Sequence, residues 1–363
     1  KGIPVLAHPL LYRMGKARLE ALVAQLKIAG LLALECVYST YNTSEERQMR
    51  TMAAKYHLLP SGGSDFHGSN KPGLDLAVGY GKLFIPEEIL DNLKKARKNL
   101  LFTDMDGTLL RKDSTVSDEM REAVRALSRA GHRLILASGR PLPSILEVQK
   151  QQGLYHPGAI VIAYNGALIY NCSTKKSIVS HRLSMEDLHF VTREAEKLGI
   201  HVHTYTNTSI VAKEYTKELE YYTKRIHLPV LLTEDFGNVL RRGPYKVQCI
   251  CLNDRGKLEV LRQVLDSHSK GRFQVAFSSD TYLEILPLAA GKGNAIQAVY
   301  EELHIPHTHT FAAGDEENDI SMLQAACHGI AMANATNQVK MAADFVTTKT
   351  NDEDGLLEVL QNL

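Results

Sequence analysis

The chain has 363 residues, which is long enough to form two or three hydrophobic cores. Its composition of 44% hydrophobic and 23% charged residues is ordinary for soluble globular protein. A net charge of +1 gives no reason to expect nucleic acid or an acidic membrane surface as a partner. The sequence contains no apolar run of transmembrane length and no signal-peptide pattern, so we expect a cytoplasmic protein. Five cysteines without CxxC spacing indicate neither a disulfide framework nor a zinc site.

The first quarter of the chain alternates short apolar runs with helical patterns, which predicts parallel βα units. The elements that we expect there are strands at 3–7 and 31–37 and helices at 18–27, 44–55 and 86–98. Ser44 or Thr43 is the expected cap of the second helix. Because the chain starts inside a predicted strand, we expect this sequence to be a fragment of a longer chain.

Polar residues close the predicted strands of this first segment, namely His8, Glu35, Asp65 and His67. Histidine and carboxylate at successive strand ends suit Zn²⁺, Mn²⁺ or Fe. The alternative interpretation is a scatter of polar residues on the surface.

These residues lie in short motifs, AHP at 7–9, ECVY at 35–38 and GSDFHG at 63–68. The set resembles the carboxyl-terminal half of a PHP-domain phosphoesterase. That family hydrolyses phosphate esters with a metal cluster inside a distorted β/α barrel. The resemblance covers residues 1–98 and implies a partial barrel with His8, Asp65 and His67 as ligands of Mn²⁺ or Zn²⁺. The ligands of the family's first half have no counterpart here, so we expect an incomplete site.

The rest of the chain also alternates strands and helices and is expected to be α/β. Predicted strands are 100–103, 132–137, 159–163, 201–206, 245–252, 272–277, 281–287, 308–313, 329–333 and 345–347. Predicted helices begin at Ser117, Ser184 and Lys292 or span 141–152, 213–225, 257–266 and 355–360. A hairpin from residue 164 leads away from the strand at 159–163.

The DMDG sequence at 104–107 places two carboxylates two residues apart, directly after the buried strand at 100–103. In an open α/β sheet, ligands bind at that edge of the strands. Gly107 permits the unusual φ that such a turn requires. One carboxylate can serve as nucleophile and magnesium ligand, and the other can protonate a leaving group and then deprotonate water. The alternative is a simple turn, because Asp and Gly are turn residues.

Three further motifs follow DMDG, namely ASGR at 137–140, GKG at 291–293 and GDEEND at 314–319. In order and spacing, the four motifs resemble those of the haloacid dehalogenase-like phosphatases, and most closely the Cof-type group of subclass IIB. The resemblance covers residues 100–363. It implies a Rossmann-like parallel-sheet core at 99–181 and 279–363, with an α/β cap inserted at 182–278.

The resemblance also implies roles for the motif residues. Asp104 would form an aspartyl phosphate, Asp106 would be the acid and base, and Lys292 would neutralise the phosphate and the nucleophile. Mg²⁺ would be held by Asp104, Asp315 and the main-chain carbonyl of Asp106, and Asp319 would orient Lys292 or the metal waters. A lone surface lysine is the alternative interpretation of Lys292.

The phosphate would be bound by Ser138, Gly139, Lys292 and Asn318, although Ser138 could also cap a helix. Asn165 and Asn334 match positions that meet the substrate in this family, and turn formation is the alternative for both. In the cap, His201, His203, Tyr205 and Arg225 are further candidates.

The sequence therefore predicts a Mg²⁺-dependent phosphatase of small phosphorylated metabolites. A phosphomutase or phosphotransferase on the same core is the alternative. The first segment could instead be an interaction module without catalysis, or a remnant metallo-phosphoesterase. The substrate and the oligomeric state do not follow from these motifs.

Overall fold

The computed structural model describes residues 3–95 and 98–363 and divides the chain into two compact units. The N-terminal unit comprises residues 1–98 with 301–309, and the large unit comprises 99–300 with 310–363. Within the two described ranges, every helix is too short or too polar to cross a lipid bilayer. Short 3-10 helices are η1 (Pro9–Tyr12), η2 (Gly68–Asn70), η3 (Tyr164–Gly166), η4 (Phe236–Asn238), η5 (His307–His309), η6 (Glu317–Asp319) and η7 (Asn351–Glu353).

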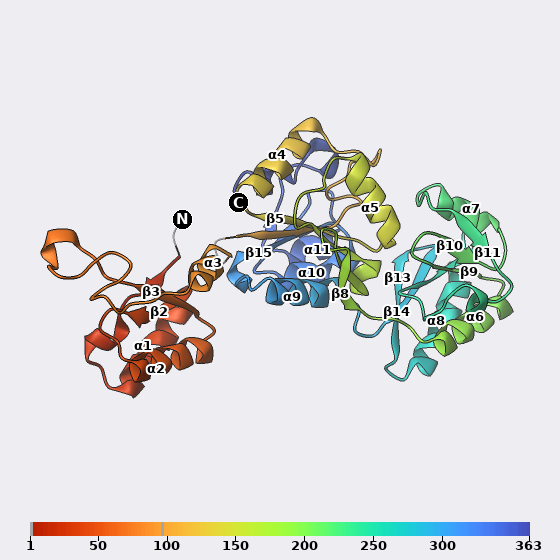
Figure 1. Ribbon diagram of the computed structural model, residues 1–363. Coiled ribbons are helices and arrows are strands. Elements are labelled where there is room, and N and C mark those ends of the chain that lie inside the picture. The colour runs from red at the N-terminus through yellow and green to blue at the C-terminus, as the bar shows by residue number, and fades with distance from the viewer. Residues whose placement is uncertain (1–2, 96–97) are drawn as a thin grey trace. The chain divides into compact units, whose positions relative to one another are not determined.

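The N-terminal unit contains a parallel sheet in the order β1-β2-β3. Its strands are β1 (Val5–Leu6), β2 (Ala33–Tyr38) and β3 (Leu59–Gly63), and its helices are α1 (Lys16–Ile28), α2 (Thr43–Lys55) and α3 (Glu87–Lys95). Leu19 of α1 and Met49 of α2 share one apolar core with Leu34 of β2, so both helices cover the same face of the sheet (Figure 1). The predicted βα pattern is confirmed, whereas closure into a partial barrel stays a prediction.

Two details of this unit differ from the sequence prediction. The cap of α2 is Asn42 rather than Ser44 or Thr43, because the Asn42 side chain accepts the N–H groups of Ser44 and Glu45. Glu45 returns a bond to the Asn42 N–H, which completes a capping box. The last predicted helix is described to Lys95, and residues 96–97 lie outside the described residues.

The large unit is built on an eight-stranded sheet in the order β17-β16-β15-β4-β5-β6-β7-β8. The strands are β4 (Leu100–Thr103), β5 (Arg133–Ala137), β6 (Ile160–Ala163), β7 (Leu168–Asn171), β8 (Lys176–Ser180), β15 (Thr310–Gly314), β16 (His328–Ala331) and β17 (Phe345–Val346). The strands from β17 to β6 are parallel, and β7 and β8 continue the sheet as an antiparallel hairpin.

Helices cover both faces of this sheet, with α4 and α5 on one side and α9 and α10 on the other (Figure 1). The core helices are α4 (Asp118–Arg129), α5 (Leu142–Gln151), α9 (Lys292–Glu302), α10 (Ile320–Ala325), α11 (Asn337–Ala342) and α12 (Leu357–Leu360). All four residues of β4 are buried, as expected for a strand covered on both faces. Strand β4 lies between β15 and β5, so the chain order reverses there and leaves a crevice at the carboxyl edge.

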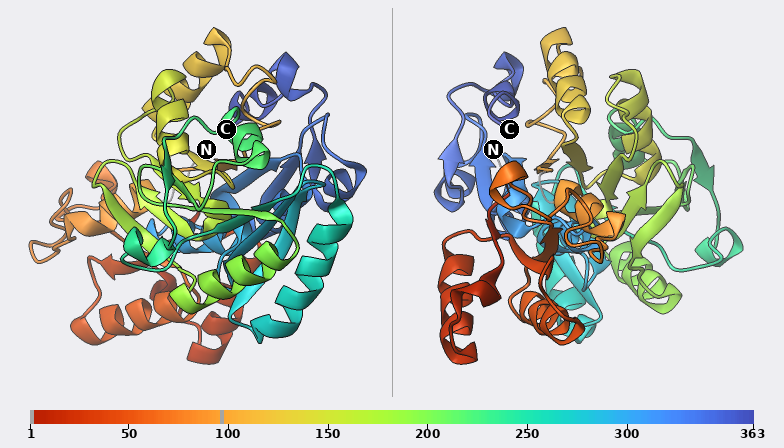
Figure 2. Two further views of the ribbon diagram at one scale, coloured as in Figure 1. Left: turned by 90° about the vertical axis from the view of Figure 1, so that its right-hand side faces the viewer. Right: turned by 60° about the vertical axis from the view of Figure 1, so that its left-hand side comes forward.

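The cap is a second, six-stranded sheet in the order β11-β10-β9-β12-β14-β13. Its elements are α6 (Met185–Lys197), β9 (His201–Tyr205), β10 (Ile210–Ala212), α7 (Lys217–Thr223), β11 (Val230–Leu232), β12 (Val247–Ile250), α8 (Arg255–Ser269), β13 (Phe273–Ser279) and β14 (Tyr282–Pro287). Helices α6 and α8 lie side by side (Figure 2, left) and share an apolar core with Val202, Val247 and Leu283. Because strand side chains alternate, His203 and Glu284 belong to the opposite, polar face.

The sheet pairing corrects the predicted boundary between cap and core. Strand β14 pairs antiparallel with β12 and β13, so it belongs to the cap sheet, and the prediction that the core resumes at 279 is wrong. The alternating pattern of a strand reveals a buried face but not which sheet the strand joins. The sequence also failed to predict the short strands β10 and β11. Helix α7 begins at Lys217 rather than at 213, because Thr216 caps it.

Candidate active site

Asp104 follows β4 at the crevice and is paired with a buried lysine. Its main-chain N–H donates to the carbonyl of Ala313 at 2.9 Å, which fixes the residue against β15. Lys292, the first residue of α9, donates to Oδ1 of Asp104 and to Oδ1 of Asp319, each at 2.6 Å. Burial raises the pKa of Asp104 well above its ordinary value, and Lys292 offsets part of that rise. For Lys292, burial lowers the pKa, but the two carboxylates outweigh it and raise the pKa above its ordinary value.

The turn after Asp104 depends on Gly107. Its φ is +86°, in the left-handed region, and a Cβ at this position would overlap the carboxylate of Asp315. The hydroxyl of Thr108 donates to Oδ1 of Asp315 at 2.7 Å. The unusual φ expected at Gly107 is therefore confirmed, and the glycine lets the DMDG turn approach Asp315 closely.

Among the described residues, Asp104, Asp315 and Asp319 form the one group of at least three ligand-type side chains close enough to hold a metal ion, with ligand atoms within 4.8 Å. Burial, together with the nearby carboxylates of Asp319 and Glu316, raises the pKa of Asp315 to about 7. Asp319 uses Oδ1 for Lys292 and Oδ2 for the N–H groups of residues 315 and 316. Asp104 and Asp315 therefore supply the hard oxygen atoms that suit Mg²⁺, and Asp319 orients Lys292.

Asp106 is held by arginines instead of by a lysine. Arg140 donates from Nη2 to Oδ1 at 2.5 Å and from Nε to Oδ2 at 2.7 Å, and Arg225 of the cap lies 3.5 Å from Oδ1. Burial raises the pKa of Asp106, but the guanidinium of Arg140 outweighs it, so the net pKa lies below the ordinary value. The sequence assigned no role to Arg140, although it is the last residue of the ASGR motif.

A cavity of about 140 Å³ lies over these residues and has walls from both the core and the cap. The lining residues are Asp104, Asp106, Ser138, Gly139, Arg140, Asn165, Glu316 and Asn318 from the core, and Tyr222, Arg225, Ile226, Lys246, Gln248, Ser278, Ser279, Tyr282 and Glu284 from the cap segment. Its walls are mostly polar, with the DMDG carboxylates on the core side. The arrangement suits a small, charged or hydroxylated ligand.

Comparison with known proteins identifies the family. The sequence profile of the haloacid dehalogenase-like hydrolases matches residues 101–360. The chain belongs to the haloacid dehalogenase-like hydrolases. It is 28% identical over 283 residues to the 5-amino-6-(5-phospho-D-ribitylamino)uracil phosphatase YwtE of Bacillus subtilis, a match that covers 72% of this chain and 96% of YwtE.

Solved structures give the same assignment. A haloacid dehalogenase-like hydrolase from Bacteroides thetaiotaomicron superposes with a TM-score of 0.69 and 28% identity over 73% of this chain and 99% of the other. The subclass IIB sugar phosphatase BT4131 has the same fold, with a TM-score of 0.63 and 23% identity over 73% of this chain and 98% of BT4131. The large unit is thus a haloacid dehalogenase-like phosphatase of the Cof type, whereas the PHP resemblance of residues 1–98 stays a prediction.

Of the predicted phosphate-binding residues, Ser138, Gly139 and Asn318 line the cavity, whereas Lys292 contacts Asp104 without lining it. Ser138 follows β5, and its Oγ accepts the N–H of Arg140 at 3.1 Å while the hydroxyl also lines the cavity. The residue that caps α5 is Pro141, so the alternative role of Ser138 as the cap is wrong. Asn318 donates to Oδ1 of Asn165 at 3.5 Å. A Cβ atom at Gly139 would lie 3.0 Å from that same oxygen, which is a tight contact.

The two asparagines predicted to meet the substrate lie in different settings. Asn165 lines the cavity and donates to Oε2 of Glu284 at 2.8 Å. The described residues that line the cavity do not include Asn334. Its amide donates to the Gly107 carbonyl at 2.8 Å, and its oxygen accepts the N–H of Asn351 at 2.9 Å. The structure therefore gives Asn334 a supporting contact to the DMDG turn rather than a contact with the cavity.

A buried ion pair that the sequence did not predict joins the cap to the loop that follows β5. Lys246 is 2% exposed and donates to Oε1 of Glu284 at 2.9 Å and to the carbonyl of Gly139 at 2.8 Å. Ser278 donates to the same carboxylate at 2.9 Å. The sequence signal that could have revealed Lys246 is the alternation of side chains along β12, which puts Lys246 and Gln248 on the face opposite to the apolar face with Val247.

Two of the candidate ligands of the N-terminal unit, Asp65 and His67, lie close together, with Nδ1 of His67 3.4 Å from Oδ1 of Asp65. Asp65 accepts a bond from the Tyr38 hydroxyl at 2.6 Å and forms an ion pair with Lys71. His67 uses Nδ1 for the main-chain carbonyl of Asp65 at 2.7 Å. Within residues 3–95, the structure brings no three ligand-type side chains to metal-binding distance. The partial site at His8, Asp65 and His67 stays a prediction, and in this arrangement Lys71 supplies the positive charge at Asp65.

Proposed function

We propose that this hydrolase is a Mg²⁺-dependent phosphatase that cleaves phosphate monoesters of small metabolites through an aspartyl phosphate on Asp104. The observation that carries the proposal is the environment of Asp104. Its carboxylate lines a polar cavity, Lys292 holds one of its oxygens, and Asp315 lies at metal-binding distance. A positioned carboxylate with a neighbouring cation is the nucleophile that phosphoryl transfer requires.

The reaction would run in two displacements on this site. Asp104 attacks phosphorus, the bond to the ester oxygen breaks, and Asp106 gives that oxygen its proton. Asp106 then takes a proton from water, which attacks the aspartyl phosphate and frees Asp104 and inorganic phosphate. Lys292 lies beside Asp104 throughout and stabilises the charge on the transferring group. Mg²⁺ bound by Asp104 and Asp315 would neutralise phosphate charge.

The contact between Arg140 and Asp106 favours one of these two steps. By lowering the pKa of Asp106, Arg140 keeps the carboxylate ionised and ready to accept a proton from water. Proton delivery to the leaving group requires the protonated carboxyl group, so we infer that this contact loosens when an ester enters the cavity. The cleavage of esters with good leaving groups, which need no proton, should depend least on Asp106.

The cap walls support small polar metabolites as substrates. The cap segment lines the cavity with hydroxyl, amide and charged groups, which suit a hydroxylated leaving group. The related protein YwtE is named for a phosphorylated ribityl compound, and BT4131 is titled a sugar phosphatase. Both names are consistent with a small phosphate ester as the substrate of this chain.

The test is a screen of phosphorylated metabolites with the purified chain and Mg²⁺, in which free phosphate and the organic product are both measured. Stoichiometric release of phosphate and the free alcohol is expected. Conversion of a sugar phosphate to an isomer without phosphate release would instead support the phosphomutase alternative. No turnover of any ester by the metal-loaded chain would overturn the proposal.

A further inference from the structure

Five polar residues form a continuous line of hydrogen bonds through the cap, which we name the cap ladder: Thr216, His201, His203, Tyr205 and Tyr222. Thr216 Oγ1 lies 3.0 Å from Nδ1 of His201, whose Nε2 lies 3.1 Å from Nδ1 of His203. Nε2 of His203 lies 3.1 Å from the Tyr205 hydroxyl, which lies 2.5 Å from the Tyr222 hydroxyl. Each imidazole therefore uses both of its nitrogens inside the ladder.

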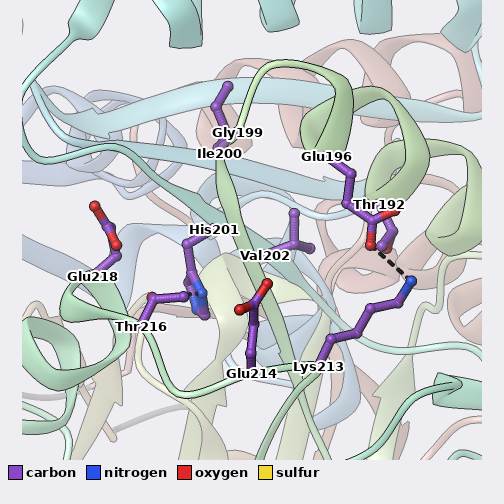
Figure 3. Close-up of a pocket in the computed structure, with 10 residues that line it drawn as sticks. All are labelled: Thr192, Glu196, Gly199, Ile200, His201, Val202, Lys213, Glu214, Thr216 and Glu218. Atoms are coloured by element: carbon purple, nitrogen blue, oxygen red, sulfur yellow. Dashed lines mark hydrogen bonds and ion pairs between the residues drawn. The ribbon is translucent and has the colours of Figure 1, made fainter.

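The two ends of the ladder reach two different cavities. His201 and Thr216 line a cavity of about 190 Å³ within the cap, where Lys213 pairs with Glu196 on another wall (Figure 3). In that view, the His201 ring is turned toward Thr216. Tyr222, at the other end, lines the active-site cavity. The middle of the ladder is closed to solvent, since His203 is 0% exposed.

Both histidines are neutral at ordinary pH. Burial lowers the pKa of His201 to about 4, against a smaller opposing effect of Glu218. Burial lowers the pKa of His203 well below its ordinary value, and His201 and Lys246 lower it further. A neutral imidazole donates from one nitrogen and accepts at the other, so each ring fixes the direction of both of its bonds.

The ladder consequently has two complete proton orders. In the first, Thr216 donates to His201, both rings carry the proton on Nε2, and Tyr205 donates to Tyr222, whose own O–H is then free to donate into the active site. In the second, every bond is reversed, both rings carry the proton on Nδ1, and Tyr222 offers only its oxygen as an acceptor. A mixed order either places two donors or two acceptors against each other or leaves the Tyr205 proton without a ladder partner, and each is costly for buried groups.

We propose that the cap ladder makes Tyr222 a specificity-determining residue whose donor or acceptor role reverses together with the tautomers of His201 and His203. This inference rests on the proposed phosphatase function, because the leaving group of the ester is the partner of Tyr222. The first order matches a carbonyl or ether oxygen, the second matches an N–H group, and a hydroxyl matches either. The same cap can then bind leaving groups that donate a hydrogen bond and leaving groups that accept one, without a change in its backbone. In this arrangement His201, His203 and Tyr205 act as positioning residues.

The direct test is the tautomer of each ring, read from imidazole nitrogen shifts of the full chain labelled with ¹⁵N-histidine. Signals are assigned with His201→Gln and His203→Gln. In Tyr222→Phe, the hydroxyl of Tyr205 retains only Nε2 of His203 as its ladder partner, so both rings should take the Nδ1–H form. Tyr221→Phe is the control, because Tyr221 is the adjacent, exposed tyrosine of α7 outside the ladder, and it should give the wild-type pattern. Opposite tautomers in the wild type, or a change at one ring only in Tyr222→Phe, would overturn the proposal.

A kinetic test addresses the active-site end. We compare kcat/KM for glycerol 3-phosphate, whose leaving group carries hydroxyls, with kcat/KM for phenyl phosphate, whose leaving group has none. Tyr222→Phe should lower this ratio about fivefold to tenfold, the size of one neutral hydrogen bond. An unchanged ratio would remove Tyr222 as a specificity determinant. If the wild type hydrolyses neither ester, the ratio is measured with a hydroxyl-bearing ester found in the metabolite screen. If no ester is hydrolysed, the proposed function fails, and the nitrogen shifts still decide whether the ladder reverses as a unit.

Discussion

The large unit and the N-terminal unit both place acidic residues at the ends of parallel strands, but among residues 3–95 and 98–363 only those of the large unit form a cluster of three at metal-binding distance. In the large unit, Asp104 and Asp315 follow neighbouring strands β4 and β15, and the pKa of each is raised by burial. In the N-terminal unit, Asp65 is bound by Lys71 and by the Tyr38 hydroxyl, and its pKa lies below the ordinary value. Lys71 neutralises the charge of Asp65, whereas Asp104 and Asp315 lie in a cluster of three buried carboxylates with one lysine, Lys292, which leaves negative charge to attract a metal ion.

Topology explains the difference. The core strand β4 lies between two parallel neighbours at the reversal of chain order, so three strand ends open on one crevice. In the three-stranded sheet of the N-terminal unit, the polar groups at the strand ends bond to one another. Glu35 accepts the main-chain N–H of His8 at 2.6 Å, and the Tyr38 hydroxyl donates to Asp65.

Asp104→Asn should lower kcat/KM for any good ester by at least about 10³-fold, because the nucleophilic oxygen is lost while the side-chain volume is kept. Phosphate release under single-turnover conditions is the measurement. The matched control is Asp113→Asn, an exposed carboxylate in the same loop region whose hydrogen-bonding partner is Thr115. A residual rate within tenfold of the wild type would show that Asp104 is not the nucleophile.

Lys292→Met should lower kcat/KM about 10²-fold, because a charge next to the transferring group is removed. It should also lower the free energy of unfolding by about 3 kcal/mol, since Asp104 and Asp319 lose their shared buried partner. Lys112→Met, at a lysine whose side chain is 88% exposed, controls for loss of charge. Equal unfolding free energies for these two variants would contradict the buried position of Lys292.

Asp→Asn substitutions should have opposite effects on stability in the two units. In metal-free protein at pH 8, Asp315→Asn should stabilise the large unit on the order of 2 kcal/mol, because an ionised buried carboxylate is replaced by a neutral group. Asp65→Asn should destabilise the N-terminal unit by about 1 kcal/mol, because the ion pair with Lys71 is lost. Hydrogen exchange, which follows the two units separately, is the measurement.

The direction of the pKa shift of Asp315 determines how the stability of the metal-free protein changes with pH. Its folded pKa of about 7 lies above the ordinary value, so the unfolded chain loses this proton first. The stability of the metal-free protein therefore falls as pH rises between the two values, and the advantage of Asp315→Asn should be small at pH 4 and full above about pH 7. An advantage that is independent of pH would mean that ionisation is not its cause.

The smallest effect is expected in the N-terminal unit. In the Asp104→Asn background, added Mn²⁺ should support no ester hydrolysis above the buffer rate, and His67→Ala should change nothing. The reason is that no three potential ligands of residues 3–95 come within metal-binding distance of one another. Robust Mn²⁺-dependent hydrolysis that disappears in His67→Ala would show that this unit carries a working centre.

The sequence predicted those parts of the site that depend on order along the chain. Asp104 and Asp315 could be placed because each directly follows a buried strand, and Lys292 because it opens a helix at the motif spacing. Contacts between segments distant in sequence could not be predicted, as for Arg140 on Asp106 or the amide of Asn334 on the Gly107 carbonyl. The predicted cap boundary was wrong for the same reason. The sequence pattern of β14 does not reveal which strands it pairs with, and in the structure it pairs with β12 of the cap.

The proposed mechanism requires a covalent phosphoryl group on Asp104, and trapping this intermediate is its most direct test. Asp106→Ala should still form the intermediate from phenyl phosphate, whose leaving group needs little protonation, but should hydrolyse it slowly because the base is absent. After an acid quench, mass spectrometry of the peptide that contains residues 104–107 should show one added phosphoryl group on Asp104. Continued phosphate release without any phosphorylated peptide, or a phosphoryl group on another residue, would contradict the account.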